Sequence, residues 1–309
     1  AIALAGYSVR LSRTLRRERA ALVHTNSLKA ALYGGVAGRL AGVPVVWHIR
    51  DRFSSDYMPT LAATILRILA LVVPSGIIVN SGSTAAALGR ASRRARVIPS
   101  PIAPPVAAPR DRAAEEFVAG IVGRLTPWKG QHVFLRAFAL AFQESAARAV
   151  IVGSPLFGES EFEKELWSLA HKLGIEDRVE FRGFREDVGA ELARLDVVVH
   201  ASTIPEPFGQ VVIEGMAAGL PVIASAEGGP LEIIDNEIDG LLAPPNDPVA
   251  LAARMRELAG NECLRRRLGR NASDKARRYS PGAIGPLVEA VYAALTPRRV
   301  HGASPESAT

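Results

Sequence analysis

The sequence predicts an α/β protein of two domains, each with a parallel sheet that helices cover on both faces. Short runs rich in β-branched residues alternate with longer stretches of helical periodicity along almost the whole chain. These short runs are apolar throughout, which is typical of parallel strands buried on both faces. A segment with five prolines, residues 99–116, separates two series of such units and fits neither a helix nor a central strand. We therefore expect it to link the two domains.

The first domain has four apolar runs that predict strands: ALVHT (21–25), PVVWHI (44–49), GIIVN (76–80) and ARVIPS (95–100). The stretch SLKAALYGGVAGRLAG (27–42) has the length and the apolar spacing of a helix. Residues 61–79 are apolar enough to raise the alternative of a membrane span, but Arg67 and Pro74 interrupt them. Because Pro74 opens a Pro-Ser-Gly turn, we expect a buried helix followed by a buried strand.

The second domain has five apolar runs that predict strands: FVAGIVG (117–123), RAVIVG (148–153), RVEFRG (178–183), LDVVVHA (195–201) and LPVIAS (220–225). Helical spacing follows the first of them at 130–146, the sheet is expected to continue to about Leu242, and two charged helices are expected within 247–278. A last apolar helix, 281–295, starts at a Pro-Gly break and is expected to pack back across the first domain. The predicted divisions are therefore 1–108, 109–280 and a C-terminal segment, 281–309, that ends in a disordered tail.

Composition fits a globular protein with two cores. The chain has 309 residues, of which 48% are hydrophobic, and this length suffices for two ordinary domains. Its single cysteine, Cys263, has no partner for a disulfide and belongs to no cluster of metal-ligand residues. These features indicate a reducing, cytoplasmic setting.

Charge is distributed unevenly along the chain. Residues 1–115 hold 16 Lys and Arg against 5 Asp and Glu, a net charge of +11, whereas residues 116–309 hold 21 against 26. A basic first half suits nucleic acid, anionic lipid or a phosphorylated substrate. It shows no interleaved aromatic residues, no helix-turn-helix signal and no Cys/His metal spacing, which argues against nucleic acid.

The segment EPFGQVVIEGMAAGLPVIAS, residues 206–225, places two carboxylates in an otherwise apolar stretch. Two open α/β sheets bind ligands at their carboxyl edges, and the loop with Glu206 follows a predicted strand there. A carboxylate can accept two hydroxyl hydrogen bonds, as a sugar diol requires. Amides near Phe208, Gly209 and Gln210 would open a helix, where an anion is favoured. With Glu214 in the same helix, the segment suits a phosphorylated polyol, although either glutamate alone also fits an ordinary solvated charge.

A second segment, GRLTPWKGQHVFL (123–135), follows the first predicted strand of the second domain. Arg124 lies at the carboxyl edge of that strand, and Lys129 opens the next helix. A guanidinium and an ammonium so placed could hold a diphosphate, the first by paired hydrogen bonds and the second as a point charge. Solvated Arg and Lys are also common after strands, so this segment alone is modest evidence.

Taken in order, GRLTPWKG, HASTIPEPFGQVVIEGMAAGLPVIAS and EGGPLEII resemble the donor domain of the retaining glycosyltransferases of family four. Members have the GT-B fold, in which two Rossmann-like domains face each other across a cleft. The resemblance covers residues 20–295 and is most specific across 117–243. Family members begin with a strand and a Gly-rich loop that lie upstream of the first residue here. We therefore expect an incomplete N-terminus and a chain that binds nucleotide but turns over poorly.

The resemblance implies a role for each matching residue. Arg124 and Lys129 would neutralise the donor diphosphate, Glu206 would bind sugar hydroxyls, and Glu214 would bind the ribose. The backbone amides of Phe208 and Gly209, beside Gln210, would contact the same sugar. Gly183 and Phe184 would cradle the base, and His48 would lie near the reacting carbon. His48 is also consistent with a core or rim histidine that has a backbone partner.

These residues predict a retaining hexosyltransferase that uses a nucleotide diphosphate sugar and a glycan or lipid-linked acceptor. No Asp-x-Asp motif occurs, so we expect no cofactor, no metal and activity that survives EDTA. We expect a cytoplasmic protein, with a peripheral contact to the inner face of an anionic membrane through the basic segments 11–20 and 91–96. The alternatives are a nucleotide-sugar epimerase of the same fold and an inactive nucleotide-sugar-binding protein.

Overall fold

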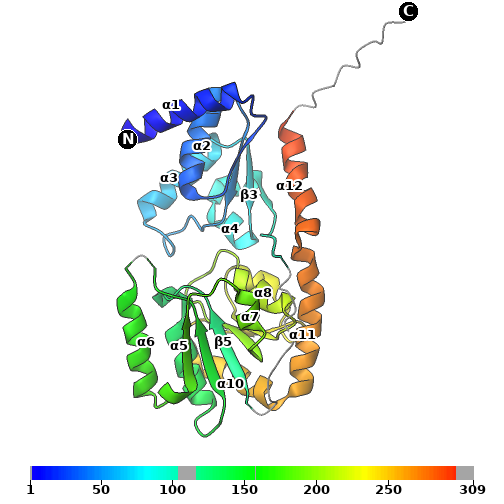
Figure 1. Ribbon diagram of the computed structural model, residues 1–309. Coiled ribbons are helices and arrows are strands. Elements are labelled where there is room, and N and C mark those ends of the chain that lie inside the picture. The colour runs from blue at the N-terminus through cyan, green and yellow to red at the C-terminus, as the bar shows by residue number, and fades with distance from the viewer. Residues whose placement is uncertain (1, 104–115, 157, 297–309) are drawn as a thin grey trace, which may run out of the picture.

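The computed structural model describes residues 2–103, 116–156 and 158–296. Two α/β domains lie one above the other in Figure 1, and the last helices run along one side of both. The first domain contains a parallel sheet with strand order β1-β2-β3-β4. Its strands are β1 (Val23–Thr25), β2 (Val45–Ile49), β3 (Gly76–Val79) and β4 (Ala95–Val97). Its helices are α1 (Ile2–Arg17), α2 (Leu28–Ala41), α3 (Thr60–Val72), α4 (Gly82–Ala87) and the 3-10 helix η1 (Gly89–Arg94).

The second domain contains a parallel sheet with strand order β10-β9-β8-β5-β6-β7. Its strands are β5 (Val118–Val122), β6 (Arg148–Val152), β7 (Val179–Gly183), β8 (Val197–His200), β9 (Val222–Ser225) and β10 (Leu241–Ala243). Its helices are η2 (Pro127–Lys129), α5 (Gln131–Ala141), α6 (Ser160–Lys172), η3 (Glu176–Arg178), α7 (Val188–Leu192), α8 (Gln210–Ala217), α9 (Gly229–Ile233), α10 (Pro248–Gly260), α11 (Glu262–Ala276) and η4 (Arg277–Tyr279). The predicted fold class of two parallel α/β sheets is thus confirmed.

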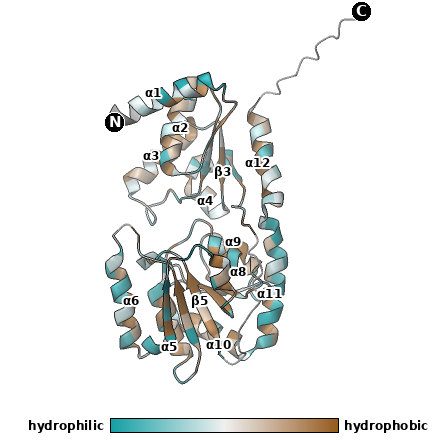
Figure 2. Ribbon diagram, viewed as in Figure 1, coloured by the Kyte–Doolittle hydropathy of each residue, from teal (hydrophilic) through white to brown (hydrophobic). Residues whose placement is uncertain are grey.

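The strands form where the sequence is apolar because both faces of each sheet are covered. Every residue of β2, β8 and β9 is buried. Phe134, Phe138 and Leu166 pack on one face of the larger sheet and are fully buried, while Ile213 and Met216 pack on the other. Figure 2 shows the same contrast, with brown central strands and teal on the outer helices α6 and α11.

The last helix, α12 (Pro281–Leu295), joins the two domains. It begins where the Ser280 side chain accepts a hydrogen bond from the Ala283 amide, and Pro281 occupies its first turn. Ile284 and Val291 are buried against Val46 and Ile78 of the first sheet. In Figure 1 this helix runs along the side of the first domain.

The expectation of a buried helix within residues 61–79 is correct for one face of α3 (Thr60–Val72) and wrong for the opposite face. β3 is buried as expected, and so are Ala63, Leu66 and Ala70 on one face of α3. The opposite face of α3 is exposed, and Leu61 has 73% of its surface accessible. The reason is geometric: α3 covers one face of an open sheet, so only one side of the helix meets the core.

Several expectations concern other parts of the chain. The predicted division at residue 108 and the predicted tail fall outside the described residues. Within 98–103, Ile102 is buried in the core of the second domain, and its amide donates to the Tyr279 carbonyl at 2.9 Å. Across the described ranges, no helix has both the length and the apolar character needed to cross a bilayer.

Candidate functional site

Glu206 is the centre of a buried cluster of polar side chains at the carboxyl edge of the larger sheet. It lies in the loop between β8 and α8, and only 7% of its surface is accessible. Lys129 Nζ lies 2.8 Å from both of its carboxylate oxygens. His200 Nε2 lies 2.7 Å from Oε2, and the Ser202 hydroxyl donates to the same oxygen at 2.8 Å. Three side chains thus converge on one carboxylate.

The charge of Glu206 is fixed by its neighbours. Burial alone would raise the pKa of this carboxyl group. The Lys129 ammonium and His200 outweigh burial and hold the pKa of Glu206 well below its ordinary value of 4.5. Glu206 is therefore ionised at neutral pH, and Lys129 neutralises it.

The loop that carries Lys129 lies directly beside the Glu206 loop. The Thr203 amide donates to the Trp128 carbonyl at 2.8 Å. Gly130 has a positive φ of 75°, and a Cβ there would lie 1.8 Å from the Ala201 carbonyl oxygen. Only glycine permits this close approach, which brings Lys129 within reach of Glu206.

Arg124 and Lys129 flank one aromatic ring. Lys129 Nζ lies 4.6 Å from the centroid of the Trp128 ring, and the guanidinium carbon of Arg124 lies 6.0 Å from it. Arg124 Nε also lies 3.5 Å from a carboxylate oxygen of Glu159. The two predicted diphosphate ligands are therefore close together, at the end of β5 in the middle of the sheet.

The other predicted residues of the second domain lie along the same edge. Glu214 is in the second turn of α8, where burial raises its pKa while Gln210 and Lys129 lower it, so Lys129 acts on both glutamates. Gly209 is the N-cap of α8, and the Phe208 side chain is buried in the core. At the end of β7, the Gly183 carbonyl accepts from the Gly153 amide at 2.9 Å. The Phe184 side chain that follows is 69% exposed.

His48 belongs to a different cluster. It is buried in β2, and its Nδ1 lies 3.2 Å from Nε2 of His24, whose Nδ1 lies 2.5 Å from the Tyr292 hydroxyl of α12. Burial, with help from Arg50 and His24, lowers the pKa of His48 to about 4, so it is neutral at pH 7. Among the described residues, no hydrogen bond joins the His48 side chain to the Glu206 cluster. The structure thus brings Arg124, Lys129, Glu206 and Glu214 together and groups His48 with His24 and Tyr292.

The first domain reaches this site through Tyr57. The Tyr57 ring meets the Trp128 ring edge-on, with centroids 6.3 Å apart. Burial and the charges of Asp51 and Glu206 raise the pKa of Tyr57 to about 12, and its hydroxyl donates to Asp51 at 3.4 Å. The loop between β2 and α3 therefore faces the cationic side of the Glu206 cluster.

A second contact between the domains lies behind the Glu206 loop. The hydroxyls of Ser81 and Thr84 both donate to the Pro207 carbonyl, at 2.5 and 3.2 Å. The carboxylate of Glu232 accepts from the Gly82 and Ser83 amides, at 2.7 and 2.5 Å. The first turn of α4 is thus bonded to both α9 and the Glu206 loop.

Sequence reasoning missed His200, Ser202, Tyr57 and this contact of α4. His200 and Ser202 belong to the segment HASTIPEPFG, so their position directly before Glu206 was an available signal. Tyr57 had no such signal, because nothing in a single sequence relates its loop to Trp128.

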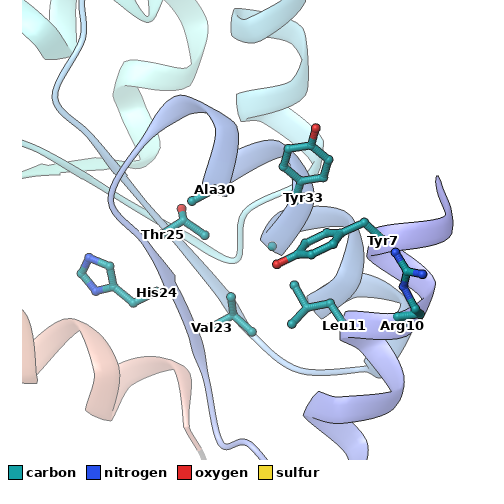
Figure 3. Close-up of a pocket in the computed structure, with 9 residues that line it drawn as sticks. Tyr7, Arg10, Leu11, Val23, His24, Thr25, Ala30 and Tyr33 are labelled. Carbon is teal, nitrogen blue, oxygen red and sulfur yellow. The ribbon is translucent and has the colours of Figure 1, made fainter. Parts of the chain in front are cut away.

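A separate pocket lies in the first domain, between α1, β1 and α2, with a volume of about 580 Å³. Figure 3 shows Tyr7, Leu11, Val23 and Tyr33 around it, while His24 points away from them. The rings of Tyr7 and Tyr33 meet edge-on, 5.3 Å between centroids. None of the predicted site residues lines this pocket.

Comparison with known families matches both domains. Residues 3–104 match the model of Glycosyltransferase Family 4, and residues 108–275, more than half of the chain, match that of Glycosyl transferases group 1. The chain belongs to the glycosyl transferases group 1 family. This membership confirms the resemblance found in the sequence.

Solved and curated members of the group 1 family are similar to this chain. The crystal structure of Anabaena Alr3699/HepE in complex with UDP and glucose superposes with a TM-score of 0.87 and is 30% identical, covering 93% of this chain and 81% of that one. The lipopolysaccharide core biosynthesis glycosyltransferase LpsD of Rhizobium meliloti is 35% identical over 59% of this chain and 51% of its own. The D-inositol 3-phosphate glycosyltransferase of Salinispora tropica is 35% identical over 53% and 35%. The matches span between 22% and 51% of the length of the curated relatives.

Proposed function

We propose that this protein transfers a hexose from a nucleotide diphosphate sugar to a glycan or lipid-linked acceptor, with retention of configuration and without a metal. The observation that carries the proposal is the cluster of Lys129, Arg124 and Glu206 at the carboxyl edge of the donor-side sheet. It combines cations for a diphosphate with a carboxylate for sugar hydroxyls. Similarity to Alr3699/HepE, which was crystallised with UDP and with UDP-glucose, supports a nucleotide sugar as the donor.

The proposed chemistry follows from charge. When the bond between the sugar carbon and the diphosphate breaks, its electron pair stays on the departing diphosphate, and positive charge develops on the sugar ring. Lys129 and Arg124 would stabilise the departing anion. An acceptor hydroxyl then forms the new bond to the sugar carbon and loses its proton to the departing phosphate. As Lys129 turns to the diphosphate, Glu206 would become free to accept hydrogen bonds from the sugar.

Isothermal titration calorimetry with UDP and UDP-glucose, in buffer with EDTA, tests the donor side. We expect Arg124→Gln and Lys129→Ala each to weaken binding about tenfold or more, because each removes a charged donor to the diphosphate. Arg148→Gln is the matched control, since Arg148 pairs with Glu116 at the surface and is half exposed. Equal affinities of all three variants and the parent would contradict the proposal. Parallel titrations with GDP, ADP and dTDP identify the base.

Chromatography of UDP-glucose incubated with the protein alone separates transfer from the epimerase alternative. Slow release of UDP supports a transferase, whereas a new sugar isomer on the intact nucleotide would contradict it.

We also propose that the protein acts in the cytoplasm and contacts the inner face of an anionic membrane. The net charge of +11 over residues 1–115 supports this proposal.

A further inference from the structure

The exposed face of α3 is an apolar stripe. Leu61, Ile65, Ile68 and Val72 are 73%, 47%, 56% and 59% exposed. Their spacing of four, three and four residues places them on one side of the helix, where they extend over roughly 16 Å. A continuous stripe of large aliphatic side chains on a helix surface marks an interaction site more often than scattered apolar residues do.

The stretch of chain that contains this stripe is rich in basic residues. No Asp or Glu occurs between Asp56 and Asp111, whereas the described part of that stretch contains five arginines: Arg67, Arg90, Arg93, Arg94 and Arg96. Arg90, Arg93, Arg94 and Arg96 are exposed.

Two arginines lie at the C-terminal end of the stripe. Arg39 of α2 donates to the Val73 carbonyl at 2.8 Å, and Arg94 donates to the Pro74 carbonyl at 2.9 Å. Their guanidinium groups satisfy carbonyls that the helix end leaves free. They therefore hold positive charge at a fixed position next to Val72.

The aliphatic stripe and the neighbouring arginines together indicate what kind of partner binds this face of α3. A second copy of the chain would bring two strongly basic domains together, and their repulsion opposes such a dimer. An anionic lipid surface satisfies both properties, because its acyl region takes aliphatic side chains and its phosphates take arginines.

We propose that α3 docks on an anionic membrane, with its aliphatic stripe inserted among the lipid headgroups and the arginines around it bound to lipid phosphates. This inference rests on the proposed membrane contact and adds α3 to the basic segments 11–20 and 91–96 as the element that enters the membrane. The loop that carries Tyr57 leads directly into α3 at Thr60. Docking through α3 therefore brings the loop that contacts Trp128 toward the lipid surface, where a lipid-linked acceptor would enter.

Sedimentation with vesicles tests the docking surface. The parent chain is expected to co-sediment at low salt with vesicles of equal parts phosphatidylglycerol and phosphatidylcholine, and not with phosphatidylcholine alone. The double variant Ile65→Glu/Ile68→Glu is expected to have at least about tenfold lower affinity for anionic vesicles, because it loses two inserted side chains and adds two negative charges. Arg90→Gln/Arg93→Gln is expected to weaken binding at low salt and to change it little at high salt.

The matched control is Ile238→Glu/Val249→Glu on the second domain, where both side chains are also more than half exposed. Its vesicle binding is expected to equal that of the parent. Insertion itself is measured with a polarity-sensitive dye on Ile68→Cys in a Cys263→Ser background, which should shift to shorter emission wavelength on anionic vesicles.

Three results would overturn the proposal. The first is equal sedimentation of Ile65→Glu/Ile68→Glu and of the control variant with anionic vesicles. The second is an unchanged emission wavelength of the dye when the protein binds vesicles. The third is a dimer of the parent chain in light scattering that becomes a monomer in Ile65→Glu/Ile68→Glu. The last would show that a second copy covers α3. A separate thermal-shift measurement with UDP-glucose, without vesicles, reports on the donor site, so loss of one proposal is distinguishable from loss of the other.

Discussion

Lys129 and Glu206 form a largely buried ion pair, in which each charge neutralises the other. Their side chains are 18% and 9% exposed, so water screens them only weakly. A buried pair of this kind contributes little compared with an apolar pair of the same shape, but loss of one partner leaves a buried charge alone. The stability of the second domain is therefore sensitive to the loss of either partner of this pair.

Lys129→Ala should therefore lower the free energy of unfolding at pH 7 by about 3 kcal/mol. The pKa of Glu206 lies below its ordinary value of 4.5 in the folded protein, so its stabilising contribution is present above that pH and is lost as the pH falls through the folded pKa. Urea unfolding from pH 7 to pH 3 should accordingly show the parent and the variant converging in acid.

The control is Lys164→Ala, because Lys164 and Glu161 form a pair with side chains 73% and 75% exposed. It should change stability by less than about 0.5 kcal/mol at every pH. A deficit of Lys129→Ala that stays constant down to pH 3 would show that Glu206 does not depend on Lys129.

At the scale of elements, α4 and α9 act as a latch between the domains. Glu232 of α9 bonds two amides of α4, and α4 in turn bonds the carbonyl of Pro207, next to Glu206. The orientation of the first domain is thereby coupled to the loop that carries the central carboxylate.

Glu232→Gln should loosen this latch, because it replaces a charged double acceptor with a neutral single one. We expect a loss of about 1 kcal/mol, or roughly a fivefold shift toward open arrangements. Spin labels on Cys263 and on an introduced Leu61→Cys report the distance between the domains, since Cys263 is exposed and is the only cysteine of the chain. The distance distribution should broaden for Glu232→Gln and stay unchanged for Glu257→Gln, and a narrow distribution in both would disprove the latch.

The strands and most helices could be predicted because burial leaves a direct pattern in the sequence. In the runs at 44–49 and 220–225, the strand residues that the sheet buries are apolar except for His48 and Ser225. The exposed face of α3 could not be predicted, because its exposed aliphatic side chains are as apolar as the buried Ala63, Leu66 and Ala70 on the other face.

The candidate site was predictable only where side chains carry the signal. Arg124, Lys129, Glu206 and Glu214 stand out as charges after strands or in a helix start. The contact of α4 with Pro207 uses a backbone carbonyl, to which any residue type contributes equally. The partner of His48, His24, lies 24 positions before it, and Tyr292, which contacts His24, lies 268 positions beyond His24.

At the scale of the whole molecule, α12 makes the first domain depend on the end of the chain. Val291 is 4% exposed and packs in the cluster that contains Val46 and Ile78. The two central strands of the smaller sheet, β2 and β3, thus share a core with a helix that follows the second domain.

Val291→Ala should destabilise the first domain by about 2 kcal/mol through the cavity that it leaves. Hydrogen exchange followed by mass spectrometry should show faster exchange of β2 and β3 and unchanged exchange of β5 and β6. Leu287→Ala, on the same helix but 48% exposed, is the control and should leave both sheets protected as in the parent. Equal acceleration in the two domains would mean that they unfold as one unit.

Within the described residues, the chain passes between the domains at 98–102 and at 279–284, and these two passages adjoin each other where the Ile102 amide donates to the Tyr279 carbonyl. These two adjacent connections define an axis about which one domain can rotate relative to the other. We expect rotation about that axis to be the easiest relative motion of the two domains, because sliding of one domain along the other would have to stretch both connections. We therefore expect ligand to enter on the side where Tyr57 and Trp128 meet. The two domains should move least relative to each other near the contact of Ile102 with Tyr279.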